Sequence, residues 1–502
     1  MRAMPRSYPP ALLVAALAVM PVGVLVGLAD NPGTVLEQRN LELLLNTLLL
    51  TATTVLGSLA VGVPLALLTA CVALPVRRLW LIALAAPLAI PSYIGAFTLY
   101  AAFGPGGEIE EAIGLLTPPV DGLAGASLVM SLYTYPFVLL TTRAALLAQD
   151  GNLVNAARSL GMPPVQCLWR VVLPRARSGI AAGALLAALY ALSDFGTPAI
   201  MGVDTFTRLI YVEYNAFGLA QAALLSLQLL VIVGLVLFLE ARVRDVAERP
   251  GRPLTLWPRR WQVFVALVAV SPVLLLSLGV PLGVFGIWLL RDGGVGFELG
   301  FAWNSVQASL AAALVAALLA LPVAHAALSG RVGRLFERVT YLGFGVPGIV
   351  MGTALVYLGL KLPGLYQTFG LLVLAYVLRF LPLAVGAART AMGTLDGGLL
   401  RAARSLGAGP GEAFRRVTLP LTLRGVVAGS ALVFLEGMRE LPATLLLAPT
   451  GFETLATYLW RVYEAGYFGR AAIPGLLLVL MSGLGLALML SGEGQLERSG
   501  ER

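Results

Sequence analysis

The sequence predicts an all-α, polytopic membrane protein of about twelve transmembrane helices, in two tandem and parallel halves of six. Three observations predict this fold class. The 502 residues are 58% hydrophobic and 12% charged, with a mean hydropathy of +0.87, whereas soluble domains carry about 25% charged residues. Uncharged stretches of about 20 residues recur along the chain, and a helix of that length crosses a bilayer. A polar pattern also occurs twice, 246 residues apart.

The apolar stretches define the expected spans in order. The first follows Arg2 and Arg6 and is too long for the apolar core of a cleaved signal peptide, so we expect it to stay in the protein. The segment 242–260, rich in Arg and Pro, joins the halves, which we expect at 1–250 and 251–502. The twelve expected spans are 11–29, 43–70, 79–103, 123–147, 179–202, 216–240, 262–290, 303–328, 336–360, 369–390, 425–448 and 471–491.

The distribution of Lys and Arg predicts how the spans are oriented. With the N-terminus inside, six of the 34 Lys and Arg residues fall on the outer side, two fall well within spans, and the other 26 lie on the inner side or at inner helix ends. Cytoplasmic loops carry an excess of Lys and Arg, so we expect a protein of the inner cell membrane with both termini in the cytoplasm. The same bias accounts for the net charge of +8 without a nucleic-acid partner. Six spans per half give both halves the same orientation.

The repeated pattern falls in two inner loops. The first copy reads Asn155-Ala-Ala-Arg-Ser-Leu-Gly161, then nine residues, then Val171-Val-Leu-Pro174. The second reads Arg401-Ala-Ala-Arg-Ser-Leu-Gly407, then nine residues, then Val417-Thr-Leu-Pro420. The positive charge of inner loops explains the arginines but not the shared spacing. A loop of one design in both halves indicates two copies of something that docks there.

Each loop is expected to form two short helices with a turn between them. Asp150 or Asn152 can cap the first helix, and Gly161 suits the left-handed position at its end. Pro164 suits the first turn of the second helix. The same positions recur in the second loop as Asp396, Gly407 and Pro410.

This spacing, Ala-Ala-x-x-x-Gly, nine residues, then Ile/Val-x-Leu-Pro, resembles the EAA loop of binding-protein-dependent ABC importer permeases, which have the MetI-like fold. In that family the loop is a coupling helix that docks on a cytoplasmic ATPase, so two loops imply a fused permease serving two ATPase copies. The chain departs from the family at the leading Glu, replaced by Asn155 and Arg401, which puts the family's charge pairing with the ATPase in doubt. The implied coupling residues are Asn155, Ala156, Ala157, Leu160 and Gly161, and Arg401, Ala402, Ala403, Leu406 and Gly407.

Two further stretches look like ferric-iron importer permeases. Tyr190-Ala-Leu-Ser-Asp-Phe-Gly-Thr-Pro198 is similar to their first half, and Glu436-Gly-Met-Arg-Glu-Leu-Pro-Ala-Thr444 to their second. The resemblance implies that an extracytoplasmic iron-binding protein delivers Fe³⁺, which passes to the cytoplasm by alternating access. Related fused permeases carry thiamine, polyamines or phosphonates, and these stay open as alternative substrates.

The chain shows no energy source of its own. It has no Gly-x-x-x-x-Gly-Lys-Ser/Thr phosphate loop, and its sole lysine, Lys361, falls in an outer loop. We therefore expect ATP and Mg²⁺ to be used by a partner ATPase, and this chain to be a transport subunit without a cofactor rather than an enzyme. A secondary transporter with twelve helices is the alternative from another class, but it has no ATPase for the inner loops to contact.

Five charged residues fall well inside the expected spans, away from their ends, where charges are costly and face a bundle interior or a cavity. Asp194 and Glu440 are 246 residues apart, so we expect these symmetry mates to approach each other. Arg439 is expected to pair with Glu436, three residues earlier, and Arg379 to reach Glu440 or Glu436. Three roles stay open: a salt-bridge cluster that fixes packing, an oxygen-rich pathway for a cation such as Fe³⁺, and gating by rearrangement of charge.

The other metal-binding residue types give no firm site. His325 is the only histidine, and no Cys or acid is close to it in the sequence. Cys71 falls in an apolar span and Cys167 in an inner loop, so nothing indicates a disulfide.

Overall fold

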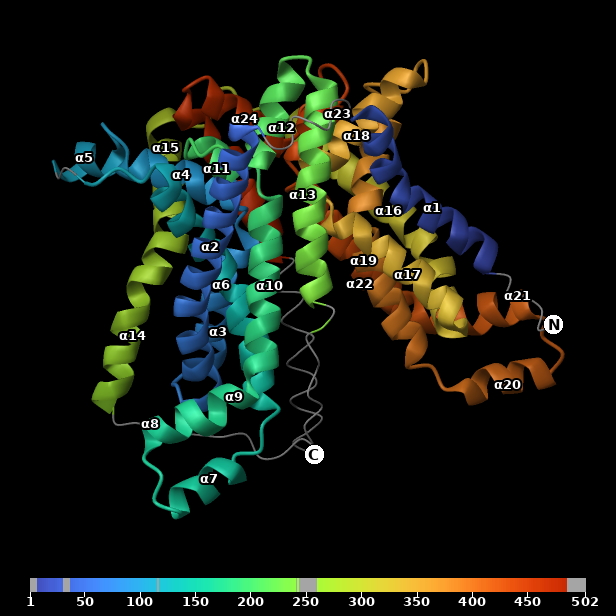
Figure 1. Ribbon diagram of the computed structural model, residues 1–502, viewed down its shortest axis with the longest axis horizontal. Helices are drawn as coiled ribbons and strands as arrows, with labels where there is room; N and C mark the ends of the chain where they lie inside the picture. Colours follow the sequence, from blue (N-terminus) through green and yellow to red (C-terminus); the bar gives the residue numbers. More distant parts are fainter. Residues whose placement is uncertain (1–6, 30–36, 115–116, 241, 243–259, 485–502) are drawn as a thin grey trace. The chain divides into compact units, whose positions relative to one another are not determined.

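A computed structural model describes residues 7–29, 37–114, 117–240, 242 and 260–484. These residues form α-helices joined by turns and short irregular segments (Figure 1). Eight helices are each long and apolar enough to cross a membrane, and up to eleven spans result if each of three bent pairs counts as one. Within this part of the chain, the predicted fold class of an all-α polytopic membrane protein is confirmed.

The single spans follow the predicted apolar stretches in order. Several contain proline, such as Pro64 and Pro136, which membrane helices tolerate because neighbouring groups satisfy the freed backbone carbonyls. The eight are α1 (Tyr8–Leu28), α2 (Gln38–Cys71), α6 (Gly122–Leu147), α13 (Leu219–Glu240), the run of α14, η4 and α15 (Trp261–Asp292), α16 (Leu299–Ser329), α19 (Phe369–Gly393), and the run of α21, η5 and α22 (Pro410–Met438).

Two expected spans, 79–103 and 336–360, are bent pairs, so their prediction as single helices is wrong. The pair α3 (Arg77–Ala85) and α4 (Ser92–Phe103) bends by 91°, and the pair α17 (Arg331–Gly345) and α18 (Gly348–Lys361) bends by 101°. A proline precedes the second helix of each pair, and a residue before proline is disfavoured in the helical region. Ile90 and Val346 accordingly have extended backbones, with ψ of 120° at both.

The expected spans 179–202 and 425–448 also end early. The helix α10 (Arg177–Ser193) stops before Asp194, and α22 (Leu419–Met438) stops before Arg439. Short helices follow at α11 (Gly196–Ile200) and α23 (Pro442–Leu447). The last expected span is described only as a helical segment over Phe468–Leu484, and residues 485–491 lie outside the described residues.

The remaining short helices connect these spans. They are η2 (Ala86–Ala89), α5 (Glu108–Ile113), α12 (Phe206–Asn215), α24 (Leu455–Glu464) and η6 (Phe468–Ala471), with the inner-loop helices given below.

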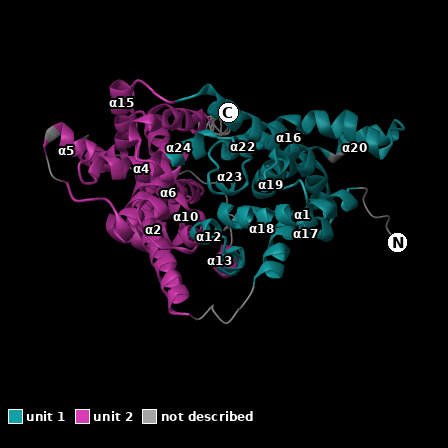
Figure 2. Cartoon of the chain, turned by 90° about the horizontal axis from the view of Figure 1, so that it is seen from above, with its two compact units in different colours: residues 1–32, 210–227, 297–461 teal, residues 33–209, 228–296, 462–502 magenta. Residues whose placement is uncertain are grey.

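The chain forms two compact units, and each takes helices from both halves of the sequence (Figure 2). Unit 1 contains residues 1–32, 210–227 and 297–461, and unit 2 contains 33–209, 228–296 and 462–502. The first helix, α1, therefore belongs to the unit made mainly from the second half, and α14 and α15 belong to the other. The compact units differ in this way from the linear division at residue 250.

In unit 2, α2 and α6 pack closely because small residues face each other. A Cβ added at Gly62 would lie 2.7 Å from Val138 Cβ, and the hydroxyls of Ser58 and Thr134 are 2.7 Å apart. Small residues and buried hydroxyl pairs are the usual means of helix association in membranes.

The exchanged helices are held by aromatic contacts inside each unit. In unit 1, Tyr8 of α1 packs edge-on against Phe336 of α17, with ring centroids 5.8 Å apart. In unit 2, Trp288 of α15 lies 5.3 Å from Phe97 of α4, and its indole N–H donates to Glu108 Oε1 at 2.6 Å. These contacts explain why α1 and α15 group with helices distant in sequence.

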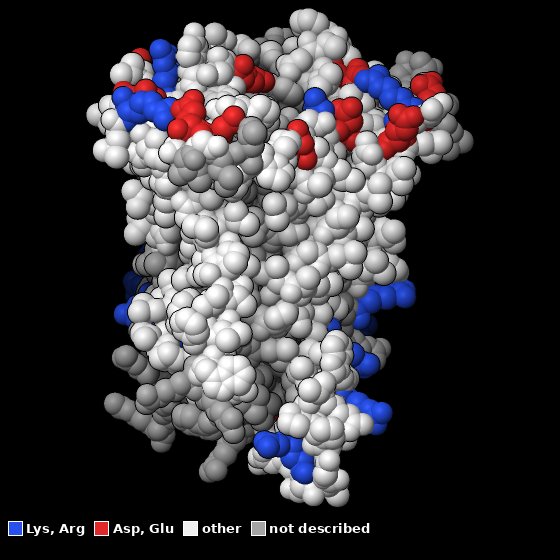
Figure 3. Space-filling model, turned by 90° about the vertical axis from the view of Figure 1, so that its left-hand side faces the viewer, with Lys and Arg blue, Asp and Glu red and all other residues white. Residues whose placement is uncertain are grey.

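The charged side chains agree with a membrane-spanning protein. On the face shown in Figure 3, acidic and basic side chains lie together at one end, Lys and Arg predominate toward the other, and an uncharged band separates them. Such a band matches the apolar core of a bilayer.

Candidate functional site

The two inner loops fold as the sequence predicts. The first contains α7 (Asn152–Ser159) and α8 (Pro164–Cys167), and Gly161 between them has a φ of +85°. The second contains α20 (Gly397–Ser405) and α21 (Pro410–Ala413), and Gly407 has a φ of +89°. A positive φ costs glycine little and strains a β-branched residue, so the predicted left-handed glycines are confirmed.

The predicted acidic caps are also present. Asp150 Oδ1 accepts from the N–H of Asn152 at 3.0 Å, and Asp396 Oδ1 accepts from the N–H of Gly398 at 2.8 Å. A carboxylate here satisfies backbone donors at the start of each helix. The prolines at 164 and 410 begin α8 and α21 as expected.

The sequence analysis missed one shared feature of the loops. A single π-helical turn follows each second helix, over Leu168–Val172 (η3) and Phe414–Thr418 (η5), positions that are 246 residues apart. The turn η3 leads to α9 (Leu173–Arg175), which is bent by 66° from α10, whereas η5 continues into α22. Such turns are frequent at functional sites, and apolar periodicity gives no signal for them.

Each loop carries a leucine that points into solvent. Leu160 and Leu406 are each 89% exposed. Asn155 and Arg401 are exposed as well, and the second alanine of each pair, Ala157 or Ala403, is partly buried. The same repeat position in both halves thus presents a leucine side chain to solvent.

The packing beneath the two loops differs. Under the first loop, Val154, Cys167 and Val172 are buried in one hydrophobic cluster, with Met162 and Leu168 packed against it. Under the second loop, residues of α16, α19, α20 and α21 line a cavity of about 840 Å³.

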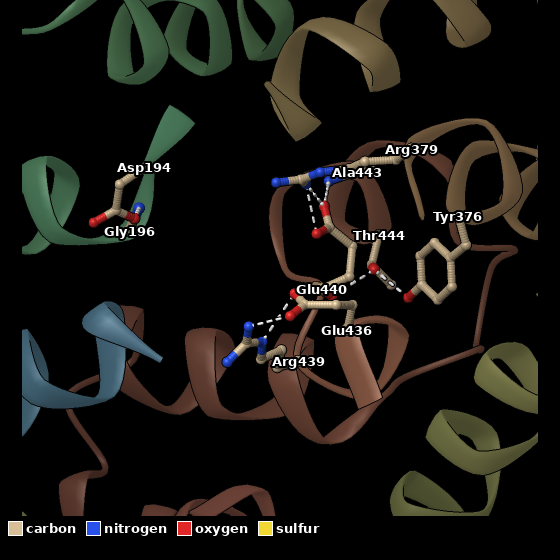
Figure 4. Close-up of polar contacts among 9 residues, drawn as sticks. All are labelled: Asp194, Gly196, Tyr376, Arg379, Glu436, Arg439, Glu440, Ala443 and Thr444. Carbon is tan, nitrogen blue, oxygen red and sulfur yellow. Dashed lines mark hydrogen bonds and ion pairs between the residues drawn. The ribbon is translucent and has the colours of Figure 1, made fainter. Parts of the chain in front are cut away.

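Four of the five charged residues singled out within the spans form two ion pairs in unit 1 (Figure 4). The guanidinium of Arg379 donates to both carboxylate oxygens of Glu440 at 2.5 Å, and Glu440 is 5% exposed. Arg439 Nε donates to Glu436 Oε2 at 3.1 Å in a more exposed pair. The predicted pairing of Arg439 with Glu436 is confirmed. Arg379, expected to reach Glu440 or Glu436, contacts Glu440.

Glu440 also organises the start of α23. Its Oε1 accepts from the N–H of Ala443 at 3.1 Å, and its backbone carbonyl accepts from the Thr444 hydroxyl at 2.7 Å. The Tyr376 hydroxyl lies 2.6 Å from the same Thr444 oxygen and donates to it. One carboxylate thus joins α19 to the break between α22 and α23.

Asp194 occupies the corresponding break in unit 2 and has different partners. Its Oδ1 accepts from the N–H of Gly196 at 3.1 Å, and its Oδ2 accepts from the Ser92 hydroxyl at 2.8 Å. Its backbone carbonyl accepts from the Thr207 hydroxyl at 2.8 Å. Asp194 thus caps the short helix α11 and ties it to the N-terminus of α4.

Ser92 and Gly348 are site residues that sequence reasoning missed. Each is the first residue of the helix after a bend. Ser92 holds Asp194, whereas a Cβ at Gly348 would collide with Arg379 and Glu440. The prolines at 91 and 347, each in an expected span, were the signal that could have found them.

Asp194 belongs to unit 2 and Glu440 to unit 1, so the expected approach of these symmetry mates stays a prediction. Among the described residues, no three His, Cys, Asp or Glu gather as a metal-binding group. Cys71 and Cys167 are buried free thiols, and His325 Nδ1 lies 3.0 Å from the Ser7 hydroxyl.

The fold and the repeated inner loops define a membrane-spanning protein of two repeats. The family model of the binding-protein-dependent transport system inner membrane component matches residues 62–245 and 309–493. The chain belongs to this family, as a fused permease with two copies of the domain. It is a multi-pass inner membrane protein and a transport component.

Similar proteins share this architecture in whole or in part. The chain is 32% identical over 484 residues, 92% of each chain, to the Fe(3+)-transport system permease protein FbpB 2 of Haemophilus influenzae. It is 22% identical to the ferric transport system permease protein FbpB of Actinobacillus pleuropneumoniae, over 79% of this chain and 63% of that one. A probable molybdenum ABC transporter permease protein of Haloferax volcanii is 31% identical, over 44% of this chain and 84% of its own.

Proposed function

We propose that this chain is the membrane-spanning subunit of an ATP-driven ferric-iron importer. The observation that carries the proposal is the likeness to an Fe(3+)-transport permease over 92% of both chains, because it includes both halves in one chain. The molybdenum relative aligns with 44% of this chain. Family membership favours this class over a secondary transporter.

In this proposal, two copies of a cytoplasmic ATPase use ATP and Mg²⁺, and each docks on one inner loop. The repeated glycine turns and the exposed Leu160 and Leu406 support this assignment. The loops are then cytoplasmic together with both termini, and 1–250 and 251–502 are the repeat units in sequence. An extracytoplasmic iron-binding protein delivers the substrate, and the permease binds no cofactor.

The intramembrane charges are proposed to line the pathway, where they hold the closed state and exchange partners during transport. Arg439 and Glu436 are 23% and 29% exposed, and this pair is the more accessible to a passing ion. Arg379 and Glu440 hold the helix break that follows this pair in unit 1, and Asp194 holds the corresponding break in unit 2. Carboxylates suit Fe³⁺, a hard cation, and their engagement with protein donors favours passage over tight binding.

The substrate is tested by reconstitution in lipid vesicles with the cognate ATPase and binding protein. We expect ATP-dependent uptake of radioactive Fe³⁺, without uptake of molybdate supplied with the same proteins. The permease alone should not hydrolyse ATP. Uptake of molybdate in place of iron would contradict the substrate, and hydrolysis by permease freed of every ATPase would contradict the subunit assignment.

The coupling role is tested with glycine variants. Gly161→Val and Gly407→Val strain the turns between the loop helices, because valine tolerates a positive φ poorly, so each should reduce co-purification of the ATPase. Gly114→Val and Gly364→Val are matched controls in other loops, since those glycines also have positive φ and an added Cβ meets no other atom within 4 Å. Equal ATPase retention by all four variants would contradict the coupling role.

A further inference from the structure

The cavity of about 840 Å³ beneath the second inner loop has a size typical of ligand sites. It lies within unit 1, at the ends of α16 and α19 that meet α20 and α21. None of the residues described so far as coupling or pathway residues lines it.

The lining combines apolar walls with one polar end. Leu321, Met392 and Phe414 are among the apolar walls, and the polar end holds Arg404 and His325. None of the lining residues is Asp or Glu, so the guanidinium has no acidic neighbour in the cavity. His325 also contacts the Ser7 hydroxyl, and its ring packs edge-on against Phe414 with centroids 6.0 Å apart.

The apolar walls continue onto an exposed face of α16. Leu310, Leu314 and Leu318 follow each other at intervals of four residues, on one side of the helix, and are 48%, 59% and 69% exposed. Leu318 also lines the cavity. Because α16 is a membrane span, an acyl chain can pass along this face from the bilayer into the cavity.

The first loop has no counterpart to this arrangement of residues. Val154, Cys167 and Leu168 correspond by the 246-residue repeat to Leu400, Ala413 and Phe414, and they belong to the filled cluster under the first loop. Val165 stands where the second loop has Gly411, which lines the cavity. Three positions of the cavity lining thus correspond to packed residues under the first loop.

We propose that this cavity binds an anionic phospholipid, with an acyl chain against the apolar walls and the phosphate at Arg404. A basic pocket between membrane helices is the usual site for an anionic lipid head group. The bound lipid would fill the space beneath α20 and so hold the second inner loop in place. Under the first loop, the side chains of the hydrophobic cluster have this role.

Binding is tested on the purified full-length permease without an ATPase, so the result is independent of the proposed substrate. Nanodiscs of phosphatidylcholine receive increasing fractions of phosphatidylglycerol, and native mass spectrometry measures retained lipid. Arg404→Gln should weaken retention of phosphatidylglycerol about fivefold, the effect of one cation near an anionic lipid. Arg158→Gln is the matched control, at the same repeat position over the filled cluster.

A second variant tests the volume of the cavity. Gly411→Leu places an apolar side chain where an added Cβ meets no other atom within 4 Å, so it should reduce lipid retention without loss of folded protein. Equal effects of Arg404→Gln and Arg158→Gln would overturn the proposal, as would equal retention of phosphatidylcholine. Displacement of the lipid by inorganic phosphate would assign the site to a free anion instead.

Discussion

Asp194 and Glu440 stand at the same position of the repeat, each at the end of a long helix and before a short one, yet their carboxylates have different partners. Glu440 accepts from the guanidinium of Arg379 and from the N–H of Ala443. Asp194 accepts from the hydroxyl of Ser92 and from the N–H of Gly196. Both acids cap the following helix, and only the partner from a neighbouring helix differs.

The difference begins at one other repeat position and at the first residue after each bend. Tyr133 stands 246 residues before Arg379, and its hydroxyl donates to the carbonyl of Ser277 at 3.1 Å rather than to an acid. At the first residue after each bend, Ser92 supplies a donor in unit 2, whereas Gly348 leaves room for the guanidinium in unit 1. The shared acid is therefore explained by helix capping, and the ion pair is a local addition.

The largest expected effect comes from removing the cation. Arg379→Met leaves the buried carboxylate of Glu440 without its charged partner, which should lower the free energy of unfolding by about 3–5 kcal/mol. Denaturant titration in detergent measures the change. Arg208→Met, in the exposed pair with Asp204, should cost at most about 1 kcal/mol.

A double variant separates loss of the pair from loss of packing. Adding Glu440→Gln to Arg379→Met removes the unpaired charge and should restore most of the lost stability. A double variant that is less stable than Arg379→Met alone would show that Glu440 does not depend on that cation.

Glu440→Gln alone should lower the free energy of unfolding by about 1.5–3 kcal/mol, the range for a hydrogen bond to a charged group. If the amide oxygen accepts from Ala443, the amide NH₂ must face the guanidinium, and both groups are donors. The unfolding midpoint and iron uptake should be measured on the same preparation. Lower stability with normal uptake per folded molecule would leave Glu440 a packing role alone.

Ser92→Ala should cost about 1 kcal/mol, the net value of an ordinary hydrogen bond. This loss is smaller than that expected for Glu440→Gln, because the carboxylate of Asp194 still accepts from the N–H of Gly196. Thermal unfolding compares it with Ser127→Ala, at a partly buried hydroxyl on α6 that donates to Leu123. If Ser92→Ala lowered the free energy of unfolding by more than Glu440→Gln does, the ranking of the two sites would be contradicted.

Asp194→Asn should be the mildest change, about 0.5 kcal/mol, at the lower end of the range for one hydrogen bond. The amide oxygen can accept from Gly196 while the amide NH₂ donates to the Ser92 hydroxyl, which can accept. An unfolding free energy near that of the unmodified protein, with reduced iron uptake, would give Asp194 a role in the pathway. A cost equal to that of Glu440→Gln would remove the distinction between the two acids.

The sequence by itself determined the fold class, the repeat and the inner-loop turns. These follow from local rules: apolar length for the spans, left-handed glycines for Gly161 and Gly407, and acidic caps at Asp150 and Asp396. The pair Glu436 and Arg439 was also predictable, because three residues on a helix bring side chains together.

The tertiary structure alone decided the exchange of α1 and α15 between units and the partners of the buried acids, whereas the prolines at 91 and 347 marked the bends in the sequence. Repeat symmetry placed Asp194 and Glu440 at one position but could not assign Ser92 to one and Arg379 to the other, since those partners come from other helices. The helices of the fifth and eleventh spans end just before these acids, and each carboxylate accepts from a backbone N–H of the next short helix. Contacts between distant segments depend on packing, and the periodicity of a single helix carries no information about its neighbours.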